Sequence, residues 1–199
     1  MLKRNFDFFV ATIFIIAASP LFLLIAIGIT LDSRGGVFYK QTRTGRYGLP
    51  FKIWKFRTMR TDADRVGGTL TVGDRDPRVT PFGYYLRKYK MDELPQLFNV
   101  WVGEMSLVGP RPEVPRYTDL YTAVQREVLS VRPGITDFAS IQFADESELL
   151  AAVENAEQFY IDTLMPQKLA LNLKYIATQN FYTDIEILFN TIKKIISKK

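Results

Sequence analysis

The feature that most constrains this chain is a long apolar run near its N-terminus. From Phe8 to Leu31 the sequence has 24 residues without a charged side chain. A continuous helix of that length would measure about 36 Å, and the hydrocarbon core of a bilayer is roughly 30 Å thick. A cleaved signal peptide does not fit, because the small residues 17–19 are followed by Pro20 and more apolar sequence. The run therefore predicts a membrane element.

Pro20 lies near the middle of the run and leaves two membrane arrangements open. A proline inside a helix removes a backbone donor and costs about 3 kcal/mol. Within lipid the freed carbonyl needs another partner, which the Ser19 hydroxyl can supply. Basic residues flank the run on both sides: Lys3, Arg4, Arg34, Lys40, Arg43 and Arg46. A simple span carries its positive charge mainly on the cytoplasmic side, so a re-entrant helix with both ends on that side competes with a kinked span.

The composition limits the available chemistry. The chain has no cysteine and no histidine, which excludes disulfides, thiol nucleophiles, and the commonest general base and transition-metal ligand. Catalysis must rest on carboxylates, Lys or Arg, hydroxyls and a hard cation such as Mg²⁺. The net charge of +5 suits an anionic partner such as phospholipid, nucleotide or nucleic acid.

The rest of the chain predicts one mixed domain without internal repeats. Two β-rich segments, 37–41 and 51–56, surround a turn and indicate a hairpin. Residues 60–80 are rich in Gly, Asp and Arg and are expected to form a functional or mobile loop. The segment "SLVGPRPEVPRY" is too rich in proline for regular structure. Helices are expected at 82–90, 94–102, 115–129 and from 147 onward, with Pro166 as a helix start.

The last predicted helix has an apolar face at helical spacing. The residues on this face are Ile185, Leu188, Phe189, Ile192, Ile195 and Ile196. Lysines crowd its end at positions 193, 194, 198 and 199. The helix either packs on the core with a solvated tail, or lies on anionic lipid as a basic amphipathic helix.

The richest short region is "LRKYKMDELPQLFNV", with adjacent acids at Asp92 and Glu93. In one interpretation Asp92 caps the helix that Pro95 helps to start. In the other, nearby cations depress the pKa of Asp92 and keep it available as an anionic nucleophile. A neighbouring Glu93 could then hold Mg²⁺ against phosphate oxygens.

Three further cations have the character of phosphate ligands. Lys55 and Arg57 stand two apart at the end of a predicted strand, in "KFRTM". Arg111 stands between two prolines in "GPRPE", so a planar cation is carried on stiff backbone. Each could instead be a surface charge or a structural ion pair. Neither a GxxxxGK[ST] loop nor a GxGxxG motif is present, so nucleotide binding of those kinds is not expected.

These motifs resemble those of a known family. "KFRTM", "DPRVTPFGYYLRKYKMDELPQLFNVWVGEMSLVGPRPE" and "VRPGIT" are similar, in order and spacing, to bacterial sugar transferases called monotopic phosphoglycosyl transferases, here in the minimal form. The N-terminal "RNFDFFVATIFIIAASPLFLL" resembles their re-entrant membrane helix. The resemblance implies a mostly helical α+β fold: a re-entrant helix-break-helix at Ser19 and Pro20 (1–33), then a catalytic domain (34–199). That domain would contain a small β-hairpin and surface amphipathic helices, on the cytoplasmic face of the bacterial inner membrane.

The resemblance also implies a reaction. The family transfers a sugar-1-phosphate from a nucleotide sugar, usually a UDP-sugar, to polyprenol (undecaprenyl) phosphate. UMP is released, and glycan synthesis begins: exopolysaccharide, lipopolysaccharide O-antigen, capsule or glycoprotein. Asp92 matches the nucleophile that forms a phosphoglycosyl-aspartate, and Glu93 matches the position that binds Mg²⁺. Arg87 and Arg111 match cationic positions near the phosphates, and Lys55 and Arg57 match a KF(K/R)TM segment.

The sequence also departs from the family pattern. Residues 137–140 follow "RPGIT" where the family often has Gly and an Ala-Gln pair, and Asn172 stands where aspartate is common. The departures leave the identity of the sugar open.

The expected partners are a UDP-sugar, polyprenol phosphate and inner-membrane phospholipid, with a homo-oligomer left open. No nucleic acid is expected, because no recognition motif accompanies the charge. The alternative function is a non-catalytic membrane-anchored adaptor, against which the intact acid pair argues.

Overall fold

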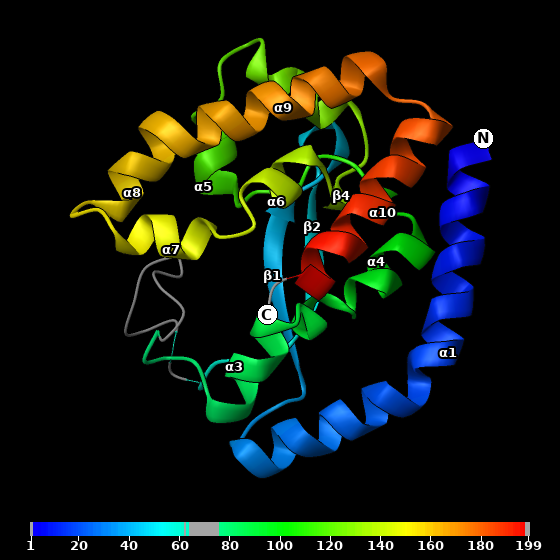
Figure 1. Cartoon of the computed structure of the whole chain (residues 1–199), viewed down its shortest axis with the longest axis vertical. Helices are drawn as coiled ribbons and strands as arrows, with labels where there is room; N and C mark the ends of the chain where they lie inside the picture. The colour runs from blue at the N-terminus through cyan, green and yellow to red at the C-terminus, as the bar shows by residue number, and fades with distance from the viewer. Residues whose placement is uncertain (1, 62, 64–75, 198–199) are drawn as a thin grey trace.

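A computed structural model describes residues 2–61, 63 and 76–197 of the chain. A long N-terminal helix, α1 (Leu2–Asp32), and a series of shorter helices surround two small sheets (Figure 1). The mostly helical α+β class expected from the sequence is therefore confirmed. The predicted loop at 60–80 lies largely outside the described residues, as do Lys198 and Lys199.

Helix α1 runs through Pro20 as one bent helix, instead of the two separate helices expected (Figure 1). Pro20 has no N–H with which to bond the carbonyl of Ile16, four residues earlier. The Ser19 hydroxyl donates to that carbonyl at 2.8 Å, so the substitute partner predicted from the sequence is confirmed. This bond lets the helix pass the proline without leaving the Ile16 carbonyl unpaired.

Both arms of α1 pack on the same domain. In the first arm, Ala11 is fully buried in a core cluster with Val100 of α4 and Ile187 of α10. In the second arm, Ile25 and Ile29 pack with other buried residues in a separate cluster. Much of the remaining apolar surface of α1 is exposed. Within the described residues, α1 is the helix long and apolar enough to cross a membrane.

The predicted hairpin is confirmed, with longer strands. Strands β1 (Phe38–Thr44) and β2 (Pro50–Phe56) are antiparallel, and Phe38 pairs with Phe56. A 3₁₀ turn, η1 (Arg46–Gly48), joins them. The buried amide of Asn99 fixes the hairpin to the helical layer, since it accepts from the Trp54 N–H at 3.0 Å and donates to the Lys52 carbonyl at 2.8 Å.

A second sheet was missed by the sequence analysis. Strands β3 (Ser106–Val108) and β4 (Gly134–Thr136) form a parallel pair, so the expectation of no regular structure in "SLVGPRPEVPRY" is wrong for its first three residues. Two glycines allow the chain segments beyond this pair to touch. A Cβ added at Gly134 would lie 2.1 Å from the Gly109 nitrogen. The "GPRPE" and "RPGIT" segments are therefore pressed against each other.

Helices α3 (Pro81–Lys88) and α4 (Gln96–Val102) confirm two of the expected helices, with the short 3₁₀ turn η2 (Met91–Glu93) between them. The single helix expected at 115–129 is wrong. It is replaced by α5 (Pro115–Thr118) and a 3₁₀ segment, η3 (Gln125–Ser130). The reason is a reciprocal capping pair, in which the side chains of Thr122 and Gln125 each accept from the other's backbone N–H at 3.3 and 2.9 Å.

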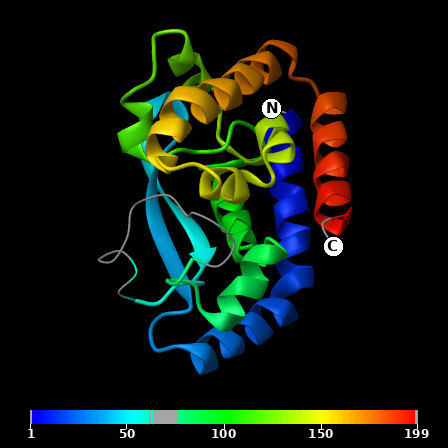
Figure 2. The ribbon, with the colours of Figure 1, turned by 60° about the vertical axis from the view of Figure 1, so that its left-hand side comes forward.

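The C-terminal part is helical, as expected. Its elements are α6 (Phe138–Gln142), α7 (Glu146–Ala151), α8 (Ala156–Phe159), the π-helical η4 (Tyr160–Leu164), α9 (Met165–Thr178) and α10 (Phe181–Ser197). Pro166 lies in the first turn of α9, as expected. Helix α10 lies beside the N-terminal arm of α1 in both views (Figures 1 and 2).

The apolar face predicted for the last helix does not pack on the core. Helix α10 buries Asp184 and Ile187, whereas Phe189, Ile192 and Ile196 are exposed. The core-packing interpretation is therefore wrong for most of that face. An exposed apolar stripe with lysines at its end has the character of a lipid-facing helix.

Candidate active site

The acid pair lies in η2, the tight turn between α3 and α4. The turn is entered through Lys90, whose φ of 56° is in the left-handed region that few non-glycine residues adopt. The residues at the N-cap positions are Lys90 and Pro95, and neither forms a side-chain cap bond. Asp92 therefore does not cap the helix. It is buried, with Oδ1 lacking a hydrogen-bond partner among the described residues.

Glu93 is held by two cations from distant parts of the chain. Lys55 Nζ of β2 donates to Glu93 Oε1 at 2.8 Å. Arg111 binds both carboxylate oxygens, with Nη1 3.0 Å from Oε2 and Nη2 donating to Oε1. The structure thus brings together three predicted site residues, although Lys55 and Arg111 lie 38 and 18 positions from Glu93. Burial alone would raise the pKa of Glu93, but Arg111 and Lys55 hold it well below its usual value.

The pKa of Asp92 is shifted in the opposite direction to that of Glu93. Burial raises the pKa of Asp92, and the negative charge of Glu93 raises it further. The positive charges of Lys55, Arg87 and Lys90 act in the other direction without cancelling these effects. The depressed pKa predicted from the nearby cations is therefore wrong, because in this structure desolvation outweighs them.

The other two predicted cations differ in their surroundings. Arg87, in the last turn of α3, acts on Asp92 through its charge. Arg57 is buried, and its guanidinium donates to the Gly36 carbonyl and to the hydroxyl and carbonyl of Ser33, at 2.5 to 2.8 Å. Arg57 therefore clamps the segment that leaves α1, and no bond joins it to the acid pair within the described residues.

The backbone of Arg111 is fixed by the second sheet and by α6. Its N–H donates to Asp137 Oδ2 at 3.1 Å. Asp137 is fully buried and caps α6 by accepting from the Ser140 N–H. The Gly134 N–H donates to the Pro110 carbonyl at 2.9 Å. Asp137, which stood out in the sequence only as a departure from the family pattern, thus holds the residue that clamps Glu93.

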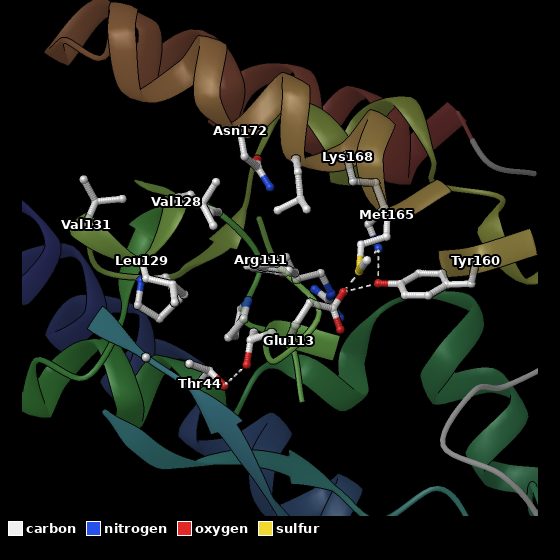
Figure 3. Close-up of a pocket in the computed structure, with 17 residues that line it drawn as sticks. Thr44, Arg111, Glu113, Val128, Leu129, Val131, Tyr160, Met165, Lys168 and Asn172 are labelled. Atoms are coloured by element: carbon white, nitrogen blue, oxygen red, sulfur yellow. Dashed lines mark hydrogen bonds and ion pairs between the residues drawn. The ribbon is translucent and has the colours of Figure 1, made fainter. Parts of the chain in front are cut away.

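Arg111 also lines a cavity that the sequence analysis did not foresee. Figure 3 shows Arg111, Glu113, Tyr160 and Lys168 converging on this space, with Asn172 above them on α9. The Tyr160 hydroxyl donates to Glu113, and Lys168 Nζ lies 3.6 Å from the same carboxylate. Burial would raise the pKa of Glu113, but Lys168 and Arg43 keep it low. Glu113 could have been suspected from its place in "GPRPE", and Asn172 stood out only as a departure from the family pattern. Tyr160 and Lys168 carried no local signal.

The donor set suits a magnesium ion that also binds substrate. The described residues contain no group of three or more acids that could hold a metal. Mg²⁺ commonly takes only one or two carboxylates and completes its shell with water and substrate phosphates. Glu93 Oε2 accepts a hydrogen bond from Arg111, and a carboxylate oxygen has a second lone pair. Asp92 Oδ1 is a buried acceptor without a partner in the described part.

Comparison with known proteins shows which family the chain resembles. Residues 1–198 match the family model described as bacterial sugar transferase. The chain is 38% identical to an undecaprenyl-phosphate glucose phosphotransferase of Komagataeibacter xylinus, over 98% of this chain and 36% of that protein. It is 37% identical to the UDP-glucose:undecaprenyl-phosphate glucose-1-phosphate transferase of Escherichia coli K12, over 98% of this chain and 40% of that protein.

A shorter relative is covered more fully. The exopolysaccharide production protein ExoY of Sinorhizobium fredii is 35% identical, over 97% of this chain and 84% of that protein. The chain therefore spans well under half of the first two relatives but most of the third. Together with the family model, this extent of similarity confirms the resemblance seen in the motifs. The chain belongs to the bacterial sugar transferase family.

Proposed function

We propose that this protein transfers a sugar-1-phosphate from a UDP-sugar to undecaprenyl phosphate, with release of UMP, and so initiates exopolysaccharide synthesis. Two relatives bear names that state such a transfer with glucose, and another is named for exopolysaccharide production. UDP-glucose is therefore the first donor to test. The observation that carries the proposal is the contrast within the acid pair. Glu93 is clamped by two cations, whereas buried Asp92 has a carboxylate oxygen without a hydrogen-bond partner among the residues that the structure describes.

Asp92 is the nucleophile in this proposal. Its carboxylate oxygen forms a bond to the sugar-bearing phosphorus while the bond to the UMP oxygen breaks, giving UMP and a phosphoglycosyl-aspartate. An oxygen of undecaprenyl phosphate then attacks the same phosphorus, and the aspartate carboxylate leaves unchanged. The positive charges of Lys55, Arg87 and Lys90, which act on Asp92, would stabilise the phosphate charge that develops beside it.

Glu93 and Arg111 hold the surroundings of the nucleophile. Glu93 would also hold Mg²⁺, which when bound would neutralise phosphate oxygens that repel an anionic nucleophile. Because Arg111 and Lys55 fix Glu93 in place, the carboxylate needs little rearrangement to serve a metal and substrate. Arg57 takes a positioning role at the end of α1 rather than the phosphate contact expected from the sequence.

The membrane arrangement we propose is a re-entrant α1, residues 1–33, with the domain of residues 34–199 on the cytoplasmic face of the inner membrane. Support comes from packing: both arms of α1 contact the same domain. A straight crossing would separate the helix ends by roughly 30 Å of hydrocarbon, and one set of contacts would be lost. The exposed apolar stripe of α10 gives that domain a second lipid-facing element.

The test is release of UMP by the purified protein in detergent or nanodiscs, with UDP-glucose and other UDP-sugars, undecaprenyl phosphate and Mg²⁺. The wild-type protein should release UMP, and Asp92→Asn should abolish release. Denaturation of a ³²P-sugar-phosphate-labelled sample should leave label on the wild-type chain but not on the variant. Release of UDP would indicate an ordinary glycosyltransferase instead. A folded protein that is inert with every donor would favour the non-catalytic adaptor.

A further inference from the structure

The cavity beside Arg111 is small. It offers about 30 Å³ to water-sized groups, and one water needs at least roughly 10–15 Å³ of such space. A sugar ring, a nucleobase or a phosphate does not fit inside it, but one hydroxyl or hydroxymethyl group does. The cavity is only partly enclosed, and Arg111 belongs both to its wall and to the clamp on Glu93. A group in the cavity would thus extend from a molecule bound at the acid pair.

Asn172 supplies an unused hydrogen-bonding group to this space. Its side chain descends from α9 into the cavity (Figure 3). The residue is only 4% exposed, and Oδ1 has no hydrogen-bond partner among the described residues. A buried amide oxygen without a partner costs about 1–3 kcal/mol. A ligand that donates a hydrogen bond there would remove that cost.

The charges around the cavity favour a neutral ligand group. Three charged residues line it, Arg111, Glu113 and Lys168, and each forms an ion pair: Arg111 with Glu93, Glu113 with Arg43, and Lys168 with Glu146. Because both lining cations already have carboxylate partners among the described residues, a phosphate would have to compete with those carboxylates. Polar, charge-balanced walls suit a hydroxyl, which can both donate and accept.

The backbone conformation at Tyr160 is a second, independent indication that this cavity is functional. Tyr160 begins the π-helical segment η4 (Tyr160–Leu164), which interrupts the run from α8 into α9. π-helical turns are rare in proteins, and those that occur often lie at functional sites. The Tyr160 hydroxyl points at Glu113 in the cavity wall (Figure 3). The π-helical turn thus contributes Tyr160 to the cavity wall. Helix α9, which follows directly, contributes Lys168 and Asn172.

We propose that this cavity receives one hydroxyl or hydroxymethyl group of the transferred sugar, and that Asn172 is a specificity-determining residue that bonds it. The proposal rests on the proposed function, since it takes the sugar-phosphate to lie at the acid pair. The rest of the sugar lies outside the cavity, on the side of Arg111 that faces the acid pair. A donor lacking that hydroxyl leaves the Asn172 amide unpaired and is therefore rejected.

The test combines variants of one residue with donors that lack one hydroxyl. UMP release is measured with UDP-glucose, or whichever UDP-sugar proves active, and with its 2-, 3-, 4- and 6-deoxy analogues. The variants are Asn172→Leu, which has similar volume without polar atoms, and Asn172→Asp, which keeps the shape. Asn190→Leu on α10, whose residue does not line the cavity, is the matched control.

In the wild type, removal of one particular hydroxyl should lower kcat/KM about tenfold, the worth of a hydrogen bond whose loss leaves its partner unpaired. Asn172→Leu should lose about the same factor with the parent donor and become indifferent to that hydroxyl. If Asn172→Leu does not fold, Asn172→Asp should still change the ratio between the parent and that one analogue. The control should behave as the wild type with all donors.

Three results would overturn the proposal. A fall in kcat/KM by the same factor for every donor would mean that Asn172 is merely structural. An unchanged deoxy-donor profile in both Asn172 variants would mean that the amide does not contact the sugar. Absence of UMP from wild-type protein with every donor would overturn the proposed function and this inference together, and is distinguished from the other two by the wild-type measurement alone.

Discussion

The Arg111 guanidinium binds both carboxylate oxygens of Glu93, so two motifs that are separate in the sequence form one site. Arg111 is itself fixed through its backbone N–H by Asp137. Lys55 adds a second cation on Glu93 from the hairpin. The nucleophile proposed here, Asp92, is adjacent to this clamp but takes no part in it. This contrast shifts the pKa values of the two neighbouring acids in opposite directions, so each acid leads to its own prediction.

Glu93→Gln should destabilise the protein by about 3–5 kcal/mol, because it leaves Arg111 and Lys55 buried without their partner. Glu157→Gln is the matched control, since Glu157 pairs with Arg116 at an exposed site, where such pairs contribute about 0–1 kcal/mol. Chemical denaturation of the detergent-solubilised protein measures both. Equal effects from the two variants would contradict the buried clamp.

The clamp also predicts a pH dependence. The pKa of Glu93 is depressed in the folded state, so its contribution to stability is present above the unfolded value of about 4.3. That contribution is lost as the pH falls through the folded pKa. The stability difference between wild type and Glu93→Gln should therefore be full at neutral pH and shrink on acidification. A difference that does not change with pH would show that Glu93 acts through its shape alone.

Asp92→Asn should abolish UMP release and also make the folded protein more stable at neutral pH. The pKa of Asp92 is raised on folding, so its ionised form is disfavoured in the native state. The stability gain should be largest above the folded pKa and should vanish below the unfolded value of about 3.9. Asp119→Asn, at an exposed position, should stay within about 0.5 kcal/mol of wild type. A loss of stability in Asp92→Asn at neutral pH would refute the desolvation argument.

The same raised pKa should appear in the kinetics. The proposed nucleophile must be ionised to react. An ordinary aspartate has a pKa of about 3.9, so kcat/KM for UMP release should begin to fall on acidification at a pH above about 3.9. The pH profile of the wild-type protein measures this directly, with its fold checked by circular dichroism at each pH. A profile that stays flat down to the ordinary aspartate range would contradict the raised pKa.

Arg57→Lys should lower stability by about 1–3 kcal/mol while leaving the KM for the UDP-sugar unchanged. A lysine cannot reproduce the planar set of bonds to Ser33 and Gly36. Arg60→Lys, at an exposed position nearby, is the control and should change neither quantity. A large rise in KM with unchanged stability would restore Arg57 to a phosphate-binding role.

Pro20→Ala should move some molecules from the re-entrant arrangement to a true span. The substitution restores the backbone bond to the Ile16 carbonyl, so the bend loses its cause. Because the chain has no cysteine, Leu2→Cys provides a single label site for an impermeant maleimide applied to spheroplasts. Labelling should appear only when Pro20→Ala is added, and Leu21→Ala, which keeps the proline, should remain unlabelled. Labelling of Leu2→Cys alone would sink the re-entrant model.

Much of the architecture could be predicted from local pattern. Length and hydropathy were sufficient for α1, and β-rich segments around a turn were sufficient for the hairpin. The order of the motifs identified the family, and the carbonyl that Pro20 leaves without a backbone donor was enough to predict the Ser19 bond. The failures are also informative. The helix expected at 115–129 is split by Thr122 and Gln125, whose side chains each accept from the other's backbone N–H.

The sequence by itself determined which residue types were available: a chain without histidine or cysteine had to place its chemistry on carboxylates and cations. Only the tertiary structure decided what each of them does. It buried Asp92 so that desolvation outweighed the cations near it, and it turned Arg57 toward Ser33. It also brought Asn172 to a cavity beside Arg111. Burial and pairing depend on contacts between distant segments, and the local pattern of a sequence does not contain them.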